Sequence, residues 1–289
     1  MKEIESMQAV VISAYKDTKY LQRLINFFQK EFKVIIHIDK KSNININDLK
    51  FNSNVSIYKR YKINWGSYNH LLAILFCLRK VIENPKIKYI HIISGGDIPV
   101  KNIKEFKKFE TSKLIFMEHF KVSELNDPNI KKRYEYGTRF SNFDSRKKAI
   151  KIVNKFYQMT HKPKKEIGRF NESQLYKGLI WMSLPKDALK YVLEYSEKNK
   201  VLDSLKNVLI PEEFYFQTIL MNSNYRKNVA SNNITYNDWS KERHGSLPAI
   251  LDESDFLQIK NGDYYFARKI DPYISRELVK IISEKINKF

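Results

Sequence analysis

Two segments of the sequence carry side chains whose types and spacing could do chemistry. Residues 211–220 begin with Pro211, Glu212 and Glu213 and continue as an apolar run, and residues 266–271 contain Arg268 and Lys269. A carboxylate can take the proton of an incoming hydroxyl, and a fixed cation can neutralise a departing phosphate. Together these groups suit the transfer of a sugar from a nucleotide to an alcohol.

The two glutamates also have a purely structural interpretation. Pro211 is a favourable first helical residue, and acids in a first turn stabilise the helix macrodipole by ~0.3–1 kcal/mol each. Glu213, however, shares a predicted helix face with Phe216 and Leu220. It would then lie beside buried surface, where lost hydration makes a carboxylate a stronger base. The helix-end role and the general-base role both remain open on these residues alone.

Other candidate ligands stand near the ends of predicted strands. A carboxylate placed like Asp39 commonly accepts hydrogen bonds from nucleotide hydroxyls, and a turn or cap is the alternative. The Ser-Gly-Gly-Asp segment at residues 94–97 could bring its backbone close to a ligand, although such turns are common. Trp239 could offer a flat apolar face to a sugar ring, or it could belong to the core or to an interface.

The motifs that are missing predict a site without a metal ion. The sequence has no Asp-x-Asp, no P-loop, no Gly-x-Gly-x-x-Gly and no zinc-binding Cys/His spacing. Cys77 lies in the apolar run at residues 71–78, so we expect a packed core thiol and not a nucleophile. His37 alternates with apolar residues, which is typical of a satisfied interior histidine and not of a ligand.

The elements that must position these residues follow a βαβ order. Residues 8–14 and 33–39 are predicted strands, and the segment between them has helical periodicity behind Asp17, a suitable N-cap. Further predicted strands cover residues 54–57, 88–94, 113–118 and 178–183, and predicted helices cover residues 68–82, 147–159 and 186–198, with Ser67 capping the first. Because parallel strands end at one edge of a sheet, residues 13–15, 39–41, 94–97 and Glu118 are expected to border one cleft.

Size and composition predict one α/β domain. The 289 residues are 43% hydrophobic and 13% aromatic, which is ample for a large core. We expect a single domain over residues 1–289, with a mostly parallel central sheet flanked by helices and a closing helix at about 272–289. One cysteine, no apolar leader and no run of ~18 apolar residues predict a cytoplasmic protein that is soluble or held at the inner membrane face.

The formal charge of +20 and the pI of about 9.6 predict that polyanions bind the surface. Part of the excess has no functional meaning if an AT-rich coding sequence produced the abundant Lys, Asn, Ile and Tyr. A rival function is a basic nucleic-acid-binding protein without enzymatic activity, suggested by the Tyr-Lys-Arg-Tyr-Lys segment at residues 58–62. We favour an enzyme whose basic surface lies near an anionic membrane or a lipid-linked glycan, and we expect no nucleic acid partner.

Seven short motifs, taken in order, resemble those of the core-2/I-branching β-1,6-N-acetylglucosaminyltransferase family, which also contains the protein O-xylosyltransferases. They lie at residues 38–41, 65–67, 94–99, 178–181, 211–214, 239–240 and 266–271. The resemblance implies a GT-A-like, Rossmann-like fold, a UDP-sugar donor, inversion at the anomeric carbon to give a β-linkage, and no required metal or other cofactor.

The resemblance also assigns roles to particular residues. The second acid of the family's Pro-acid-Glu motif is the catalytic base and corresponds to Glu213. The lysine of its Phe-Ala-x-Lys motif contacts the diphosphate and corresponds to Lys269. By the same resemblance we expect donor-binding roles for Asp39, Trp65, Asp97, Arg243, His244 and Arg268, and acceptor-binding roles for Glu118, Trp181 and Trp239.

The sequence departs from the family pattern at one functional position. The family usually has an arginine two residues after a histidine in the last loop, whereas here His244 is followed two residues later by Ser246. Arg243 or Arg268 could substitute, but a hydroxyl cannot replace the two fixed donors of a guanidinium. The disulfides and N-terminal anchor of vertebrate members are also missing, which suits a bacterial enzyme of surface polysaccharide synthesis. Acetylglucosamine, another hexose and xylose all remain possible as the donor sugar.

Overall fold

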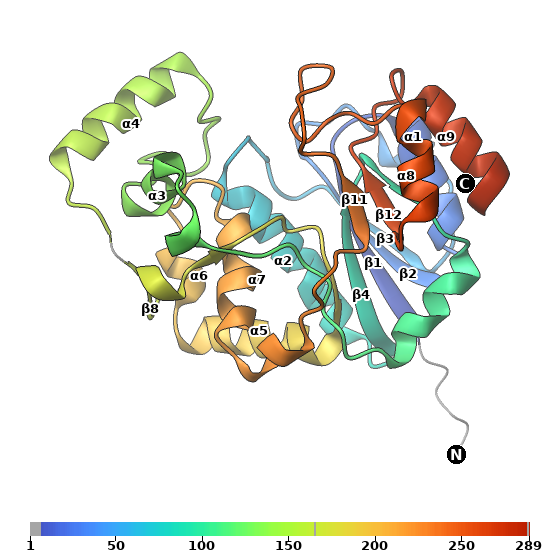
Figure 1. Cartoon of the computed structure of the whole chain (residues 1–289), viewed down its shortest axis with the longest axis horizontal. Helices are drawn as coiled ribbons and strands as arrows, with labels where there is room; N and C mark the ends of the chain where they lie inside the picture. Colours follow the sequence, from blue (N-terminus) through green and yellow to red (C-terminus); the bar gives the residue numbers. More distant parts are fainter. Residues whose placement is uncertain (1–6, 165, 288) are drawn as a thin grey trace.

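A five-stranded sheet with the strand order β10-β4-β1-β2-β3 forms the centre of the molecule (Figure 1). The computed structural model describes residues 7–164, 166–287 and 289. Four strands run parallel, and β10 pairs with β4 in the antiparallel direction. The bounds are β1 Met7–Ala14, β2 Phe32–Ile38, β3 Val55–Tyr58, β4 Ile87–Ser94 and β10 Ser183–Pro185. The predicted strands at residues 8–14, 33–39, 54–57 and 88–94 are confirmed.

The central strands are apolar on both faces because helices cover both faces. Along β1, Ala9 and Val11 belong to one buried cluster, whereas Val10 and Ile12 belong to the other. The first cluster includes side chains of α2 (Tyr68–Glu83), α5 (Lys186–Lys198) and α7 (Glu212–Met221), and the second those of α1 (Thr18–Phe28), α8 (Phe256–Asn261) and α9 (Arg276–Ile282). The two groups of helices lie on opposite sides of the sheet (Figure 1). The result is the predicted single α/β domain.

The two helix caps predicted from the sequence have different outcomes. Asp17 caps α1, since its Oδ1 accepts a hydrogen bond from the Tyr20 backbone N–H at 2.7 Å. Ser67 holds the N-cap position of α2 but makes no side-chain bond to the helix, so this prediction was wrong. Its hydroxyl instead accepts a hydrogen bond from the Asn64 backbone N–H at 3.1 Å, and this bond stabilises the loop before the helix. Cys77 is buried in α2 as expected, and burial raises the pKa of its thiol to about 12.

A second, small sheet stands beyond the carboxyl end of β4. Its strand order is β11-β12-β5, with β11 at Thr235–Asn237, β12 at Phe266–Arg268 and β5 at Asp97–Pro99. The register places Arg268 opposite both Asn237 and Asp97. Because β5 follows β4 after only two residues, this sheet is fixed at the edge where the parallel strands end.

Two predicted strands are wrong. Within residues 113–118, Ile115 and Phe116 form only isolated bridges, to Val229 and Ser183. Residues 178–182 are irregular, and only Ser183 enters a strand. Both segments contain apolar residues that are buried against loops and helices. Strand propensity cannot distinguish this kind of burial from burial within a sheet. The chain instead pairs β6 (Phe120–Lys121) with β9 (Tyr176–Lys177).

The remaining helices and strands lie outside the two main sheets. The predicted helix at residues 147–159 is α4, and the helix expected from about residue 272 begins at Arg276. Among the described residues, no helix is both long and apolar enough to cross a lipid bilayer. The other bounds are α3 Pro128–Glu135, α4 Lys148–Thr160, β7 Glu166–Ile167, β8 Phe170–Asn171 and α6 Val201–Ser204, with a π-helical segment at Ser283–Asn287.

Candidate active site

Glu213 lies in the first turn of α7, a helix whose other residues are all buried. The Glu213 side chain keeps 17% of its surface exposed. Its Oε2 lies 3.0 Å from Arg133 Nη1 and 3.4 Å from Lys177 Nζ. Three residues earlier, Ile210 has a φ of 57°, a strained conformation for a β-branched residue and one that clusters at functional sites. Because the other residues of α7 are buried, Glu213 is the residue of this helix that solvent can reach.

The surroundings of Glu213 make it a stronger base than an ordinary glutamate. Burial raises the pKa of its carboxyl, while Lys177 and Arg133 oppose the rise and Glu212 adds to it. Because basicity increases with pKa, a partly desolvated and still reachable carboxylate suits proton abstraction from a hydroxyl.

Glu212 points into a different environment. Its Oε1 lies 2.8 Å from His70 Nδ1, and the His70 ring packs 5.8 Å from the Trp181 ring. The guanidinium carbon of Arg268 lies 4.9 Å from the centroid of the same Trp181 ring. Trp181 is buried and contacts both groups, and its contact with an acceptor stays a prediction.

Arg268 and Asp97 form a buried ion pair across the small sheet. Arg268 Nε lies 3.1 Å from Asp97 Oδ1, and Asp97 also accepts bonds from the backbone N–H and the hydroxyl of Ser94. Burial lowers the pKa of the Arg268 guanidinium, and Asp97 opposes this change. The pair joins the end of β4 to β12 and thereby fixes the strand that leads into Lys269.

Lys269 is half-buried beside other cations. Burial lowers the pKa of its ammonium, nearby Arg268 and Lys16 lower it further, and Asp97 opposes them. Its Nζ donates to the hydroxyl of Ser246 at 2.9 Å. The position where the sequence lacks the expected arginine is therefore in direct contact with Lys269. Two other cations lie near Lys269 and both are paired, Arg268 with Asp97 and Lys16 with Asp271 at 3.2 Å.

Arg243 is held by three carboxylates. Its guanidinium lies 3.1 Å from Asp238, 3.1 Å from Asp252 and 2.8 Å from Asp255. The neighbouring His244 is exposed, and its Nε2 lies 3.6 Å from Asp252 Oδ2. To bind a diphosphate in place of the missing arginine, Arg243 would have to leave partners that it already has.

Asp39 directly follows β2, and Trp65 lies in the loop between β3 and α2. Asp39 Oδ1 accepts from the backbone N–H groups of Lys41 and Ile63, at 3.0 and 3.1 Å, so this acid fixes the loop after β3. Trp65 is exposed, and the Arg146 guanidinium lies 5.6 Å from its ring centroid. The loop that Asp39 holds also carries Trp65, which brings two predicted donor-binding residues to the same edge of the sheet.

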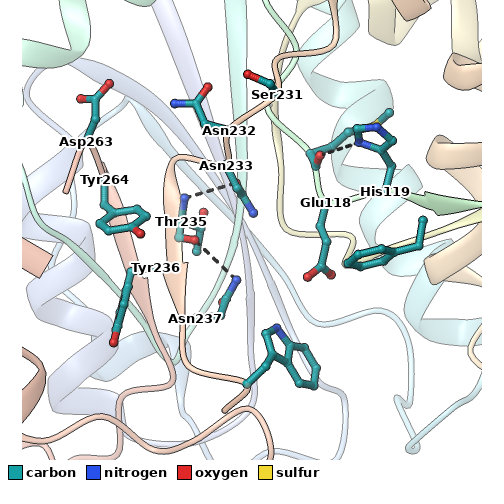
Figure 2. A pocket seen from close by; sticks show the side chains of 13 residues that line it. Glu118, His119, Ser231, Asn232, Asn233, Thr235, Tyr236, Asn237, Asp263 and Tyr264 are labelled. Atoms are coloured by element: carbon teal, nitrogen blue, oxygen red, sulfur yellow. Dashed lines mark hydrogen bonds between the residues drawn. The ribbon is translucent and has the colours of Figure 1, made fainter. Parts of the chain in front are cut away.

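A pocket of about 560 Å³ opens beside the small sheet, and Glu118 and Trp239 both line it. In Figure 2 the Glu118 carboxylate points into the hollow, toward Thr235 and Asn237 of β11. Glu118 Oε2 accepts from the Leu179 backbone N–H at 3.2 Å. Burial raises the pKa of Glu118, while the Leu179 bond, Lys177 and Arg268 oppose the rise. Two residues predicted to contact an acceptor thus share one pocket.

Lys177 and Gly178 connect this pocket to Glu213. The Lys177 ammonium acts on both carboxylates, Glu118 and Glu213. The Gly178 backbone N–H donates to the Glu213 carbonyl at 2.9 Å, and its Cα faces the Glu118 carbonyl so closely that a Cβ would overlap it. The main chains of the two acidic residues are therefore separated by a single glycine, and one ammonium group lies near both carboxylates.

Comparison with known proteins places the chain in a family. The family model described as Core-2/I-Branching enzyme matches residues 9–260. The chain belongs to the Core-2/I-branching enzyme family. It is similar to Xylosyltransferase 2 of Rattus norvegicus, with 23% identity over 297 residues that cover 91% of this chain and 32% of that protein. Xylosyltransferase oxt of Drosophila melanogaster is 20% identical over 298 residues, with 92% and 32% coverage.

The core-2/I-branching match confirms the family predicted from the seven ordered motifs. The mixed sheet flanked by helices is consistent with the predicted GT-A-like fold. The chain spans about a third, 32%, of the length of the curated relatives that it matches.

In this core-2/I-branching chain, sequence reasoning missed four residues that shape the site. Arg133 and Lys177 neutralise Glu213, His70 binds Glu212, and Lys16 stands near Lys269. Each partner is far from its acid or cation along the chain, so no local motif identifies the pair. The sequence signal that could have identified Lys177 is its position directly before the family motif at residues 178–181.

Replacing Gly178 by alanine is expected to lower the free energy of unfolding by about 1–3 kcal/mol, because the new methyl group forces the Glu118 main chain away. Urea denaturation measures this loss. Gly96→Ala is the matched control, since a Cβ at Gly96 meets its nearest neighbour, the Ile270 carbonyl, at 3.4 Å. Equal stability of the two variants would show that the Gly178 contact is not tight.

Proposed function

We propose that this chain transfers a glycosyl group from a UDP-sugar to a hydroxyl group of a glycan acceptor, with inversion at the anomeric carbon. The observation that carries the proposal is the accessible, partly desolvated Glu213 carboxylate in a Core-2/I-branching chain, which Lys177 and Gly178 link to Glu118, an acid that lines the pocket. The cations around Lys269 support it, because a leaving diphosphate needs positive charge nearby.

In the proposed step, Glu213 takes the proton from the acceptor hydroxyl as its oxygen attacks the anomeric carbon. The new oxygen–carbon bond forms on the face opposite the diphosphate, while the bond between that carbon and the phosphate oxygen breaks. The electron pair leaves with UDP, and the proton stays on Glu213 until solvent removes it. Arg133 and Lys177 keep Glu213 ionised before the reaction, since each stabilises the charged form.

The donor is proposed to lie across the carboxyl ends of the parallel strands. Lys269 neutralises the diphosphate, and Asp39 and Trp65 lie near the nucleoside. Arg268 and Asp97 position the strand before Lys269 through their buried pair. Arg243 is proposed to organise its loop through three aspartates, whereas Lys269 makes its hydrogen bond to a neutral hydroxyl and is the cation proposed to meet the phosphates.

The acceptor is proposed to bind in the pocket between Glu118 and Trp239. A carboxylate and an exposed tryptophan are the groups that suit a sugar, since one accepts bonds from hydroxyls and the other covers an apolar ring face. Asn237 Oδ1 is buried on the same wall without a partner within the described residues, so it can accept a further bond.

The proposal is tested by screening donors for UDP release. The purified chain is incubated with UDP-xylose, UDP-acetylglucosamine, UDP-glucose and UDP-galactose, each with simple glycoside acceptors, and NMR gives the anomeric configuration of any product. We expect one donor to be preferred and the product to be a β-glycoside. Retention of the donor's configuration would exclude the single displacement by the activated hydroxyl.

Transfer is expected to be unaffected by EDTA. Residues 7–164, 166–287 and 289 contain no group of three His, Cys, Asp or Glu side chains arranged to hold a metal ion, and Lys269 supplies fixed charge where a metal would otherwise be needed. Initial rates with and without chelator provide the measurement. Loss of activity in EDTA followed by recovery with Mn²⁺ would contradict the metal-independent mechanism.

A further inference from the structure

Helix α4 (Lys148–Thr160) turns its apolar face outward. Ile152, Phe156 and Met159 recur at i, i+4 and i+7 and form one row on the helix. These side chains are 60%, 67% and 75% exposed, although such a row normally packs against a core. Figure 1 shows α4 at the outer edge of the molecule, far from the central sheet. We call this row the apolar ridge.

The orientation of the apolar ridge is fixed by the opposite side of the helix. Asn154 Oδ1 accepts from the Thr138 hydroxyl at 3.0 Å and from the Arg139 backbone N–H at 3.2 Å. Ile150 and Tyr157 lie on this same side and are half-buried. Because these contacts hold the side of α4 that carries Asn154 toward the body, the ridge faces away from it.

The charge around the apolar ridge has one sign. Between residues 145 and 163 every formally charged side chain is a cation: Arg146, Lys147, Lys148, Lys151, Lys155 and Lys162. The nearest acid before this segment, Asp144, is paired with Arg146 at 2.8 Å. Lysines beside an apolar row can extend their ammonium groups to the headgroups of a bilayer while the row enters its apolar layer.

We propose that α4 docks this chain on an anionic lipid bilayer, with the apolar ridge inserted at the boundary between headgroups and acyl chains. The charge complementarity decides the occupant. A second copy of the chain would bring two sets of unbalanced cations together, whereas an anionic bilayer neutralises them and also covers the ridge.

Docking through α4 would also orient the candidate active site. The segment before α4 is bound to the loop that carries Trp65, through Asn64 Nδ2 and the Asn142 carbonyl at 2.7 Å and through Arg146 over the Trp65 ring. The Trp65 edge of the cleft is therefore on the α4 side of the molecule. The binding inference itself stands apart from the proposed sugar transfer, because it needs no substrate.

The test is co-sedimentation of the whole chain with phosphatidylcholine vesicles that contain or lack phosphatidylglycerol. We expect binding to the anionic vesicles and not to the neutral ones. Lys151→Glu with Lys155→Glu is expected to reduce the partition coefficient about 25-fold or more, because each cation near such a surface contributes roughly a fivefold factor. Ile152→Ser with Phe156→Ser is expected to abolish the salt-resistant part of binding.

Matched variants separate this surface from general charge and general apolarity. Lys104→Glu with Lys107→Glu makes the same charge change at exposed lysines on another element, and Leu257→Ser removes another exposed apolar side chain. Both controls are expected to bind within about twofold of the unchanged chain, since screening limits the reach of exposed charges. Equal loss in the controls and the α4 variants would overturn the proposal.

A fluorescent label reports the depth of the ridge directly. Met159→Cys offers one reactive thiol, because Cys77 is the chain's one cysteine and is buried. An environment-sensitive dye at this position is expected to shift to shorter emission wavelengths on anionic vesicles. An unshifted dye on bound protein would show that another surface docks. Concentration-dependent dimerisation that Phe156→Ser abolishes, without vesicle binding, would assign the ridge to a second copy instead.

Discussion

Replacing Glu213 by glutamine is expected to reduce kcat by ~10²–10⁴-fold, the usual contribution of a positioned general base. Glutamine keeps the size of the side chain and can still accept from Arg133 and Lys177, but it cannot take the hydroxyl proton. UDP binding is expected to persist, because the donor-binding wall lies on other elements. Initial rates and a UDP titration by calorimetry measure the two quantities. Near-normal turnover would remove Glu213 from the mechanism.

Glu212→Gln is the matched control for Glu213→Gln. Both acids are in the first turn of α7, so both substitutions remove a similar helix-dipole contribution of ~0.3–1 kcal/mol. Glu212 binds His70 and is buried, whereas Glu213 reaches solvent. If the acids served only the helix, the two variants would lose activity equally. A much larger loss in Glu213→Gln isolates the chemical role.

The pH profile gives a second readout of Glu213. Burial raises the pKa of this carboxyl, so the base form is present above the raised pKa and is lost as the pH falls through it. On the acidic side of the profile, we expect kcat/KM to fall at a higher pH than it would for an ordinary glutamate, whose pKa is about 4.3. This fall should vanish in Glu213→Gln.

Replacing Lys269 by alanine is expected to slow transfer by about 10²–10³-fold, because negative charge on the leaving oxygens grows as the anomeric bond breaks. The KM for the donor and the inhibition constant of UDP are both expected to rise, since the ammonium also attracts the ground-state diphosphate. Steady-state kinetics with UDP as product inhibitor measure both effects. An unchanged UDP inhibition constant would show that Lys269 does not contact the diphosphate.

Two further variants define the site around Lys269. Lys104→Ala removes an exposed lysine on a different element and is expected to leave the kinetics unchanged. Ser246→Arg places a guanidinium beside Lys269, where Ser246 now accepts its hydrogen bond. This variant is expected to bind UDP more tightly, because a second fixed cation with two donors faces the same phosphates.

Much of the sheet could be predicted because its strands follow simple burial rules. β1, β2 and β4 are mainly apolar, as is usual for parallel strands covered on both faces, and α1 repeats its apolar residues at helical spacing. The three-residue strands β5, β11 and β12 are too short for such a pattern. Residues 113–118 look like a strand because Ile115, Phe116 and Met117 are buried, yet their backbone forms only two isolated bridges, to Val229 and to Ser183.

The candidate site also has residues that local sequence predicts and contacts that it does not. Glu213 and Lys269 were predicted because each belongs to a local motif, and Glu118 was predicted because it ends an apolar segment and the family resemblance gives it an acceptor-binding role. The ion pairs of Glu213 with Arg133 and of Arg243 with three aspartates depend on how separate segments fold together. Charge count alone did not indicate which cations would have partners.

The close contact at Gly178 bears on how the acceptor range of such an enzyme can be redesigned. Because the main chains of Glu118 and Glu213 both contact the same glycine, backbone geometry sets how far apart the main chains of the pocket acid and the proposed base lie. Libraries that vary this wall would lose the catalytic alignment. Diversity is better introduced on the facing wall, at Ser231, Asn232 and Asn233, where side chains border the hollow and can change without moving either acid.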